Sequence, residues 1–347
     1  MAPPQRPKFM PAHFDPTDLP TDVQELIHRA IHRLWDNDLV AFPTETVYGI
    51  GAHAARPEAV RKLFEVKGRP AHHPLIVHIP GAEWMTQWAQ DIPQTAWDLA
   101  RAFWPGPMTL ILKKLPWVPA EVTGGQDTVG LRVPDHPITL ALLYAFATSG
   151  RPGRGGIAAP SANRFGRISP TSAEDVLEEL GTHASVILDG GPCKVGIEST
   201  IIDLSRRTPV ILRPGAISPK RLAEILGKAP AYGSEYPDPN APRVPGTVTA
   251  HYAPRTPTRL MSMPEILAYV DNHPNERCGI LAYTLPQNMS STHIWRMVPP
   301  MPEAYAHELY GALRKLDRRC ADQILIETPP EIPEWDAIRD RLTRAAK

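Results

Sequence analysis

Apolar residues along the first two thirds of the chain follow two patterns, one helical and one strand-like. Apolar positions three and four residues apart predict helices, and short apolar runs that end at Gly or Pro predict strands. The predicted helices cover 22–34, 57–66, 93–104, 138–148, 173–180 and 218–226. The predicted strands cover 39–42, 75–79, 109–112, 128–134, 157–163, 186–189, 199–204 and 210–213. So many strands among fewer helices indicate an α/β fold with a twisted mixed sheet and a concave face, rather than a regular alternation of strand and helix.

The pattern changes in the last third of the chain, where strands and helices alternate. A strand from residue 259 precedes a helix over 264–270, strands over 279–283 and 294–298, a helix over 303–316, a strand over 321–326 and a helix over 335–346. This order predicts a small Rossmann-like α/β domain. No Gly-x-Gly-x-x-Gly follows a strand in it, so the sequence does not support a dinucleotide site there.

A stretch rich in Pro, Gly, Tyr and Ser separates the two patterns and is typical of a stiff linker. The length of 347 residues also favours two domains over one. We therefore expect four parts, namely an N-terminal extension over 1–20, a first domain over 21–228, a linker over 229–257 and a second domain over 258–347.

Charge and composition argue against several classes of protein. The 37 Lys and Arg residues balance 37 Asp and Glu residues, whereas a surface built entirely to bind nucleic acid carries a basic excess. Cys193, Cys278 and Cys320 lie far apart, without the spacing of a zinc site or a disulfide framework. No apolar run reaches transmembrane length, and residues 1–20 lack the apolar core of a signal peptide. These features predict a cytoplasmic protein with no membrane partner.

Candidate chemistry is concentrated between residues 38 and 78. Gly68 can end the helix over 57–66, which places Lys67 and Arg69 at the helix end rather than buried in its face. An Arg holds a phosphate or carboxylate through two parallel hydrogen bonds, and a nearby Lys adds a point charge, so the pair suits a polyanion. The alternative is that both cations only interact favourably with the helix dipole.

The strand over 75–79 carries His78 back towards a turn that contains Thr46, if this strand pairs with the strand over 39–42. A hydroxyl and an imidazole placed together can bind a small ligand's amine or hydroxyl. The alternative is that Thr46 caps a turn and that His78 is an ordinary strand residue.

Further candidates lie later in the first domain. Arg132, on one face of the strand over 128–134, is a candidate carboxylate clamp or, alternatively, a solvent-facing strand residue. Ser161 and Asn163 follow small residues, so a ligand can lie against the backbone there, although an ordinary Ser/Asn turn has the same composition. The doubly cationic segment 149–156 is favoured as a surface insertion over a lid or a nucleic-acid contact.

Three short motifs, taken together and in order, carry a family resemblance. Pro43-Thr44-Glu45-Thr46-Val47-Tyr48-Gly49-Ile50-Gly51, then Lys67-x-Arg69-Pro70, then Pro160-Ser161-Ala162-Asn163 resemble the YrdC/Sua5 family, the threonylcarbamoyl-AMP synthases. The matching context spans residues 21–228. His251-Tyr252-Ala253-Pro254 resembles the end of the interdomain motif of the longer, two-domain Sua5 type, although the middle of this motif lacks the usual Met and basic residues.

The resemblance implies an enzyme that condenses L-threonine, bicarbonate and ATP into threonylcarbamoyl-AMP and pyrophosphate. It implies Mg²⁺ with the ATP, no metal site in the protein itself, and a downstream threonylcarbamoyl transferase complex that modifies adenosine 37 of tRNA. Direct, weak contact with tRNA is left open. Lys67 and Arg69 take the catalytic role, because they stabilise charge on the phosphates.

The resemblance also assigns ligand contacts, position by position. The implied L-threonine site consists of Thr46, His78, Arg132, Ala159 and Ser199. The implied ATP site consists of Lys67, Arg69, His73, Thr128, Ser161, Asn163, Ser169, Arg213, His251 and Tyr252. Many relatives have Asn where this chain has His73.

Two alternatives belong to other functional classes. One is a carbamoyltransferase that works through carbamoyl-adenylate, although related maturation proteins carry Cys-rich zinc modules that this sequence lacks. The other is a non-catalytic RNA-binding protein with a basic concave face, which the zero net charge disfavours.

Overall fold

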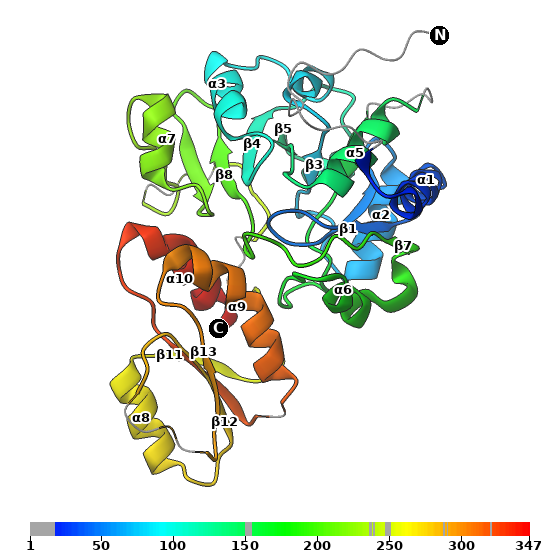
Figure 1. Cartoon of the computed structure of the whole chain (residues 1–347). Coiled ribbons are helices and arrows are strands. Elements are labelled where there is room, and N and C mark those ends of the chain that lie inside the picture. The colour runs from blue at the N-terminus through cyan, green and yellow to red at the C-terminus, as the bar shows by residue number, and fades with distance from the viewer. Residues whose placement is uncertain are drawn as a thin grey trace.

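The computed structural model describes residues 18–149, 155–235, 238, 240–246, 251–286, 289, 291–319 and 321–347. Within this part, the chain forms a ten-stranded sheet and a four-stranded sheet, each with its own helices (Figure 1). Most of the predicted N-terminal extension, residues 150–154 of the predicted insertion and residues 247–250 of the linker fall outside the described residues. Among the helices described, none is both long and apolar enough to cross a lipid bilayer.

The larger sheet is mixed, as the sequence predicts. Its order is β10-β9-β8-β4-β5-β3-β6-β2-β1-β7. The strands are β1 (Val40–Phe42), β2 (Gly49–His53), β3 (Ile76–His78), β4 (Met108–Lys113), β5 (Thr128–Arg132), β6 (Ile157–Ala158), β7 (Val186–Ile187), β8 (Thr200–Asp203), β9 (Val210–Arg213) and β10 (Ala231–Tyr232). The helices of this part are α1 (Thr21–Trp35), α2 (Pro57–Lys67), α3 (Gln94–Phe103), α4 (Ala120–Thr123), α5 (Pro137–Ala147), α6 (Ala173–Leu180) and α7 (Pro219–Leu226).

Strand β2 and the pairing of β3 differ from the sequence-based prediction. The segment that forms β2 has the composition of a turn because it contains Gly49 and Gly51, which are poor strand formers. A Cβ atom at Gly51 would lie 2.5 Å from Ile157 and 2.6 Å from Phe42, so the sheet has no room for a side chain there. Strand β3 pairs with β5 and β6 rather than with β1, because β6 and β2 lie between them.

The smaller sheet is parallel, with the order β11-β14-β12-β13, and confirms the predicted α/β domain. Its strands are β11 (Thr258–Met261), β12 (Cys278–Ala282), β13 (Ile294–Met297) and β14 (Gln323–Glu327). Its helices are α8 (Met263–Asn272), α9 (Pro302–Asp317) and α10 (Asp336–Ala345). Helices α9 and α10 lie on the side that faces the larger sheet (Figure 1).

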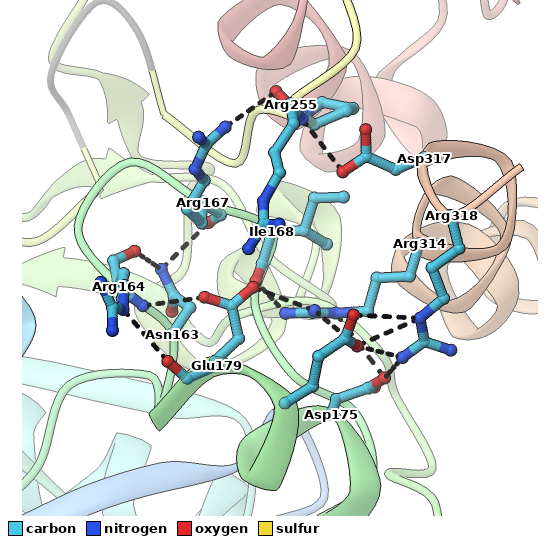
Figure 2. A network of polar contacts seen from close by, with 12 residues as sticks. Asn163, Arg164, Arg167, Ile168, Asp175, Glu179, Arg255, Arg314, Asp317 and Arg318 are labelled. Atoms are coloured by element: carbon cyan, nitrogen blue, oxygen red, sulfur yellow. Dashed lines mark hydrogen bonds and ion pairs between the residues drawn. The ribbon is translucent and has the colours of Figure 1, made fainter. Parts of the chain in front are cut away.

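Helix α9 is bound to helix α6 of the first part by a cluster of ion pairs (Figure 2). Arg314 is 5% exposed and donates to Glu179 at 3.1 Å and to the carbonyl of Ile168 at 2.5 Å. Arg318 pairs with Asp175 at 3.2 Å and also with Glu178. Apolar side chains from both parts pack into one core beside this cluster. The two parts are therefore joined by a buried interface as well as by the linker.

Candidate functional site

Helix α2 positions the two predicted catalytic cations. It begins at Pro57, whose fixed φ suits a first turn, and ends at Gly68, which has a φ of 61°. Lys67 is at the helix end, as predicted, but it is only 3% exposed, so the prediction that it avoids burial was wrong. Its Nζ extends beneath the neighbouring loop, where it donates to the carbonyl oxygens of Ser161, at 2.6 Å, and of Asn163.

A narrow cavity of about 50 Å³ lies between the concave face of the larger sheet and the end of the linker. Its lining combines hydroxyl, imidazole and guanidinium groups from segments that are far apart in the sequence. The residues are Thr44, Thr46, Val47, Gly49, Arg69, Ile76, His78, Arg132, Ala159, Pro160, Ser161, Glu198, Arg213, Pro245, Gly246, His251 and Tyr252.

Arg132 enters this cavity from the end of β5. It is 4% exposed, so the alternative of a solvent-facing strand residue is wrong. Its Nη2 donates to Glu45 Oε1 at 2.6 Å and to Thr46 Oγ1 at 2.9 Å. Glu45, which the sequence analysis did not single out, therefore neutralises Arg132, and its other carboxylate oxygen accepts from the backbone NH of Asp135 at 2.9 Å. The Nη1 group of Arg132 has no partner among the described residues and is available to a ligand.

His78 and Ala159 line the cavity beside Arg132, whereas Ser199 lies one layer behind it. Burial, followed by the charge of Arg132, lowers the pKa of His78 to about 3, so its imidazole is neutral at pH 7. Ser199 Oγ accepts from Arg213 Nη2 at 3.1 Å and contacts Thr109 Oγ1 at 2.8 Å. Ser199 therefore orients Arg213 rather than facing the cavity.

Three buried cations give this region its electrostatic character. Lys67, Arg69 and Arg213 are each less than a tenth exposed. Across the part of the chain that the structure describes, no carboxylate lies within ion-pair distance of any of them. Burial lowers the pKa of Arg69 to about 10, and it also lowers the pKa values of Lys67 and Arg213. Burying unpaired cations is costly, so the arrangement indicates a site for an anion.

The other residues of the implied ATP site have different positions. Ser161 lines the cavity, and its Oγ donates to Asn163 Oδ1, while Asn163 Nδ2 donates to two carbonyls of the same loop and shapes the turn. Ser169 donates to Glu198 Oε1 at 2.5 Å.

Two residues of the implied ATP site do not line the cavity. His73 packs edge-on against a Phe ring, and Thr128 lines an adjoining small cavity instead.

The end of the linker closes the cavity through His251 and Tyr252, both of which are buried. Tyr252 has a φ of 61°, which is uncommon for a side chain of this size. Gly246 has a φ of 81°, and a Cβ atom there would lie 2.1 Å from Tyr252 Oη. This arrangement of the linker therefore requires Gly at position 246.

Several buried polar atoms of the lining lack a hydrogen-bond partner among the described residues. They are Arg69 Nε, His78 Nδ1, His251 Nδ1 and Tyr252 Oη. Buried polar atoms in proteins are nearly always hydrogen-bonded, so four such atoms around one cavity mark points where a polar ligand is held. The described residues contain no cluster of three or more metal-ligating side chains.

A larger cavity, of about 400 Å³, lies between the end of β9 and the starts of α7, α9 and α10. Its lining is mainly apolar and contains none of the site residues expected from the sequence. Because Arg69, Arg213 and the unpaired polar atoms line the narrow cavity instead, we assign the functional site to the narrow one.

Comparisons with known proteins agree over nearly the whole chain. Residues 32–215 match a protein family described as "Telomere recombination", which unites Sua5, YciO and YrdC, and residues 217–347 match one described as "Threonylcarbamoyl-AMP synthase, C-terminal domain". The threonylcarbamoyl-AMP synthase of Pyrococcus abyssi is 38% identical over 90% of this chain and 91% of its own. That of Bacillus subtilis is 37% identical over 96% of both chains. The crystal structure of P. abyssi Sua5 complexed with L-threonine is similar with a TM-score of 0.81, at 36% identity, over 92% of this chain and 94% of that one.

Proposed function

The chain belongs to the Sua5/YrdC family as a two-domain threonylcarbamoyl-AMP synthase, and we propose that its narrow cavity is where L-threonine, bicarbonate and ATP are condensed. One observation carries this assignment. Two buried guanidinium groups without carboxylate partners, Arg69 and Arg213, and four buried polar atoms without hydrogen bonds line this one cavity, and the buried Lys67 lies beneath the loop of Ser161 beside it. A polyanion with hydrogen-bonding groups, such as ATP, satisfies both sets at once.

L-Threonine occupies the part of the cavity around β3 and β5 in this proposal. Arg132 Nη1 holds its carboxylate, since Nη2 is already bonded to Glu45 and Thr46. The neutral imidazole of His78 accepts from the ammonium or hydroxyl group of threonine, and the small side chain of Ala159 leaves room for the ligand. Ser199 contributes indirectly, by orienting Arg213.

ATP lies with its phosphates against Arg69 and Arg213, next to Ser161, and Lys67 adds its charge from beneath the loop that carries Ser161. His251 and Tyr252 cover it, whereas Asn163 and Ser169 support residues of the lining. His73 and Thr128 contact the nucleotide only if it extends beyond the present cavity. Mg²⁺ accompanies the ATP, because its oxygen ligands can come from phosphates and water.

The reaction needs positioning and charge stabilisation rather than a protein nucleophile. The neutral amine of threonine attacks bicarbonate with release of water, or CO₂ with release of a proton, to give a carbamate. A carbamate oxygen then attacks the α-phosphorus of ATP, and pyrophosphate leaves. The three cations stabilise the charge that develops on the phosphates.

The cavity is smaller than its proposed ligands. Sites for molecules of this size span roughly 300–1,000 Å³, whereas the cavity holds about 50 Å³. The linker end around His251 and Tyr252 must therefore move outward to admit ATP, and it returns over the bound substrates.

The wider setting follows the family. We propose catalysis by residues 21–228, a linker over 229–257 and a second domain over 258–347, in the cytoplasm. Threonylcarbamoyl-AMP then passes to a threonylcarbamoyl transferase complex that acts on adenosine 37 of tRNA.

The test of this function is pyrophosphate release from ATP by the purified full chain. We expect release only when threonine and bicarbonate are both present, together with an adenylate that has the mass of threonylcarbamoyl-AMP. Release driven by carbamoyl phosphate would favour a carbamoyltransferase, and salt-sensitive RNA binding without turnover would favour the RNA-binding alternative. Either outcome would contradict the proposal.

A further inference from the structure

Glu198 is the only carboxylate among the described residues that line the narrow cavity. It is 6% exposed and directly precedes Ser199, whose hydroxyl and carbonyl oxygens both accept from Arg213. A negative charge at this position is unfavourable for a site that binds a triphosphate. It repels the phosphates, and its electrostatic attraction for Arg213 opposes theirs.

Residues of the second domain hold this carboxylate. Arg341 of α10 is fully buried, and its Nε donates to Glu198 Oε2 at 2.8 Å. Tyr310 of α9 donates to the same oxygen at 2.9 Å, and Ser169 donates to the other at 2.5 Å. Burial opposes ionisation, but Arg341, Arg213 and the bond from Ser169 lower the pKa of Glu198 to about 2, so the group is charged at pH 7.

The same two side chains contact the residue that closes the cavity. The Arg341 guanidinium lies 5.4 Å from the centre of the Tyr252 ring, within the range of a cation–π interaction. Tyr310 stacks on Tyr252 with 5.8 Å between the ring centres. Two residues from α9 and α10 thus fix both a charge inside the cavity and the aromatic ring above it.

We propose that Arg341 and Tyr310 are positioning residues for the ATP site, because they hold the Glu198 carboxylate away from Arg213 and leave that guanidinium free for phosphate. This inference rests on the proposed function of the cavity. It assigns the second domain a direct part in nucleotide binding. When Arg341 is absent, Arg213 is the other cation that interacts electrostatically with Glu198, and their pairing blocks the phosphate site.

The test compares Arg341→Met with the double variant Arg341→Met/Glu198→Gln in the full chain. We expect Arg341→Met to raise the KM for ATP at least tenfold and the KM for threonine less than threefold. The double variant should recover most of the affinity for ATP, because an amide cannot form an ion pair with Arg213. Arg339→Met is the matched control, since Arg339 also lies on α10 but pairs with Asp336 away from the cavity.

Glu198→Gln alone separates positioning from stability. It removes a negative charge from the cavity and leaves Arg341 with a weaker partner, so ATP should bind at least twofold more tightly while the melting temperature falls. A purely structural role for Glu198 would weaken binding and stability together. Tyr310→Phe, which removes one hydrogen bond, should raise the KM for ATP two- to threefold and serves if Arg341→Met does not fold.

Two results would overturn the proposal. One is an unchanged KM for ATP in folded Arg341→Met, and the other is an equal loss of affinity in the single and double variants. ATP binding measured by calorimetry gives the same comparison without turnover. If the proposed synthase activity is wrong, pyrophosphate release will not depend on threonine. That result differs from the two results that overturn this inference, so the two failures can be distinguished.

Discussion

At the scale of single residues, burial decides which groups of the site are charged. Lys67, Arg69 and Arg213 are cations that burial makes costly, and His78 and His251 are imidazoles that burial keeps neutral. Neutral imidazoles accept hydrogen bonds without adding positive charge beside the cations. The site therefore combines an anion-binding group of cations with uncharged hydrogen-bonding groups.

The buried imidazoles predict a dependence of stability on pH. Burial lowers the pKa values of His78 and His251 to about 3, against roughly 6.5 in an unfolded chain. As the pH falls below about 6.5, the unfolded chain binds protons that the folded chain does not, so the free energy of unfolding decreases by up to about 1.4 kcal/mol per pH unit for each imidazole. Their contribution is fully present above about pH 6.5 and is lost as the pH falls towards 3.

Urea unfolding at pH 7, 6 and 5 measures this dependence. His78→Gln should reduce its slope by up to about 1.4 kcal/mol per pH unit, whereas the exposed control His28→Gln should leave the slope unchanged. The pKa of Glu198 is lowered from 4.5 to about 2, and because both values lie below pH 5 this group contributes little to the dependence. Equal stability of the wild type at pH 7 and pH 5 would refute the prediction.

At the scale of secondary structure, local patterns predict most of the described α-helices and strands, with α4, β2 and β10 as the exceptions. Helix α2 is specified by Pro57, one apolar face and Gly68, so its prediction is confirmed to within a residue. The sequence analysis missed strand β2, because its two glycines weaken the local strand signal. The need for glycine there comes from close packing against neighbouring strands. Packing between segments distant in sequence is not visible in local patterns.

Local sequence patterns also predict only part of the candidate site. The motifs predict residues that the structure gathers around one cavity, including Thr46, Arg69 and Ser161. They do not predict Glu45 or Glu198, whose roles come from Arg132, 87 residues away, and from Arg341, 143 residues away. An isolated Glu in a sequence carries no sign of such a partner, so only the fold identifies it.

The linker end provides a prediction at this scale. Gly246→Ala places a Cβ atom 2.1 Å from Tyr252 Oη and a side chain at a φ of 81°, so the closed arrangement should be disfavoured by at least about 1–2 kcal/mol. We expect kcat/KM for ATP to fall by about five- to thirtyfold. Gly227→Ala is the control, because Gly227 has a φ of 77° but no atom within 4 Å of the added Cβ. Steady-state kinetics of the two variants decide the matter, and similar kinetics in both would show that the close contact with Tyr252 has no role.

At the scale of the whole molecule, the second domain stabilises the turn that carries Ser161 and Asn163 as well as Glu198. Glu179 accepts from the backbone NH of Arg164, at 3.2 Å, and from Arg314 of α9, at 3.1 Å (Figure 2). Asn163 donates to the carbonyls of Arg164 and Arg167 in the same network. The turn that carries Ser161 is therefore connected to α9 through Glu179, and the two domains should unfold as one unit.

Arg314→Met tests this coupling. It leaves Glu179 and the carbonyl of Ile168 without their buried partner, which should lower the free energy of unfolding by about 3–5 kcal/mol. The exposed pair Arg101 and Asp98 gives the control Arg101→Met, with an expected loss below about 1 kcal/mol. In calorimetry, the wild type should show one transition and Arg314→Met two. A single, unshifted transition in Arg314→Met would contradict the coupling.

The central claim, that threonylcarbamoyl-AMP forms in the narrow cavity, is tested most directly by product formation from ¹³C-bicarbonate, threonine and ATP, followed by mass spectrometry. The variants to compare are Lys67→Met/Arg69→Met and the control Arg61→Met, whose side chain lies on the exposed face of the same helix. The wild type and the control should both form ¹³C-labelled threonylcarbamoyl-AMP. Losing one buried cation costs about 2–5 kcal/mol, or roughly 30- to 5,000-fold in rate, so the double variant should form almost none. Undiminished product from the folded double variant would place the reaction elsewhere in the molecule.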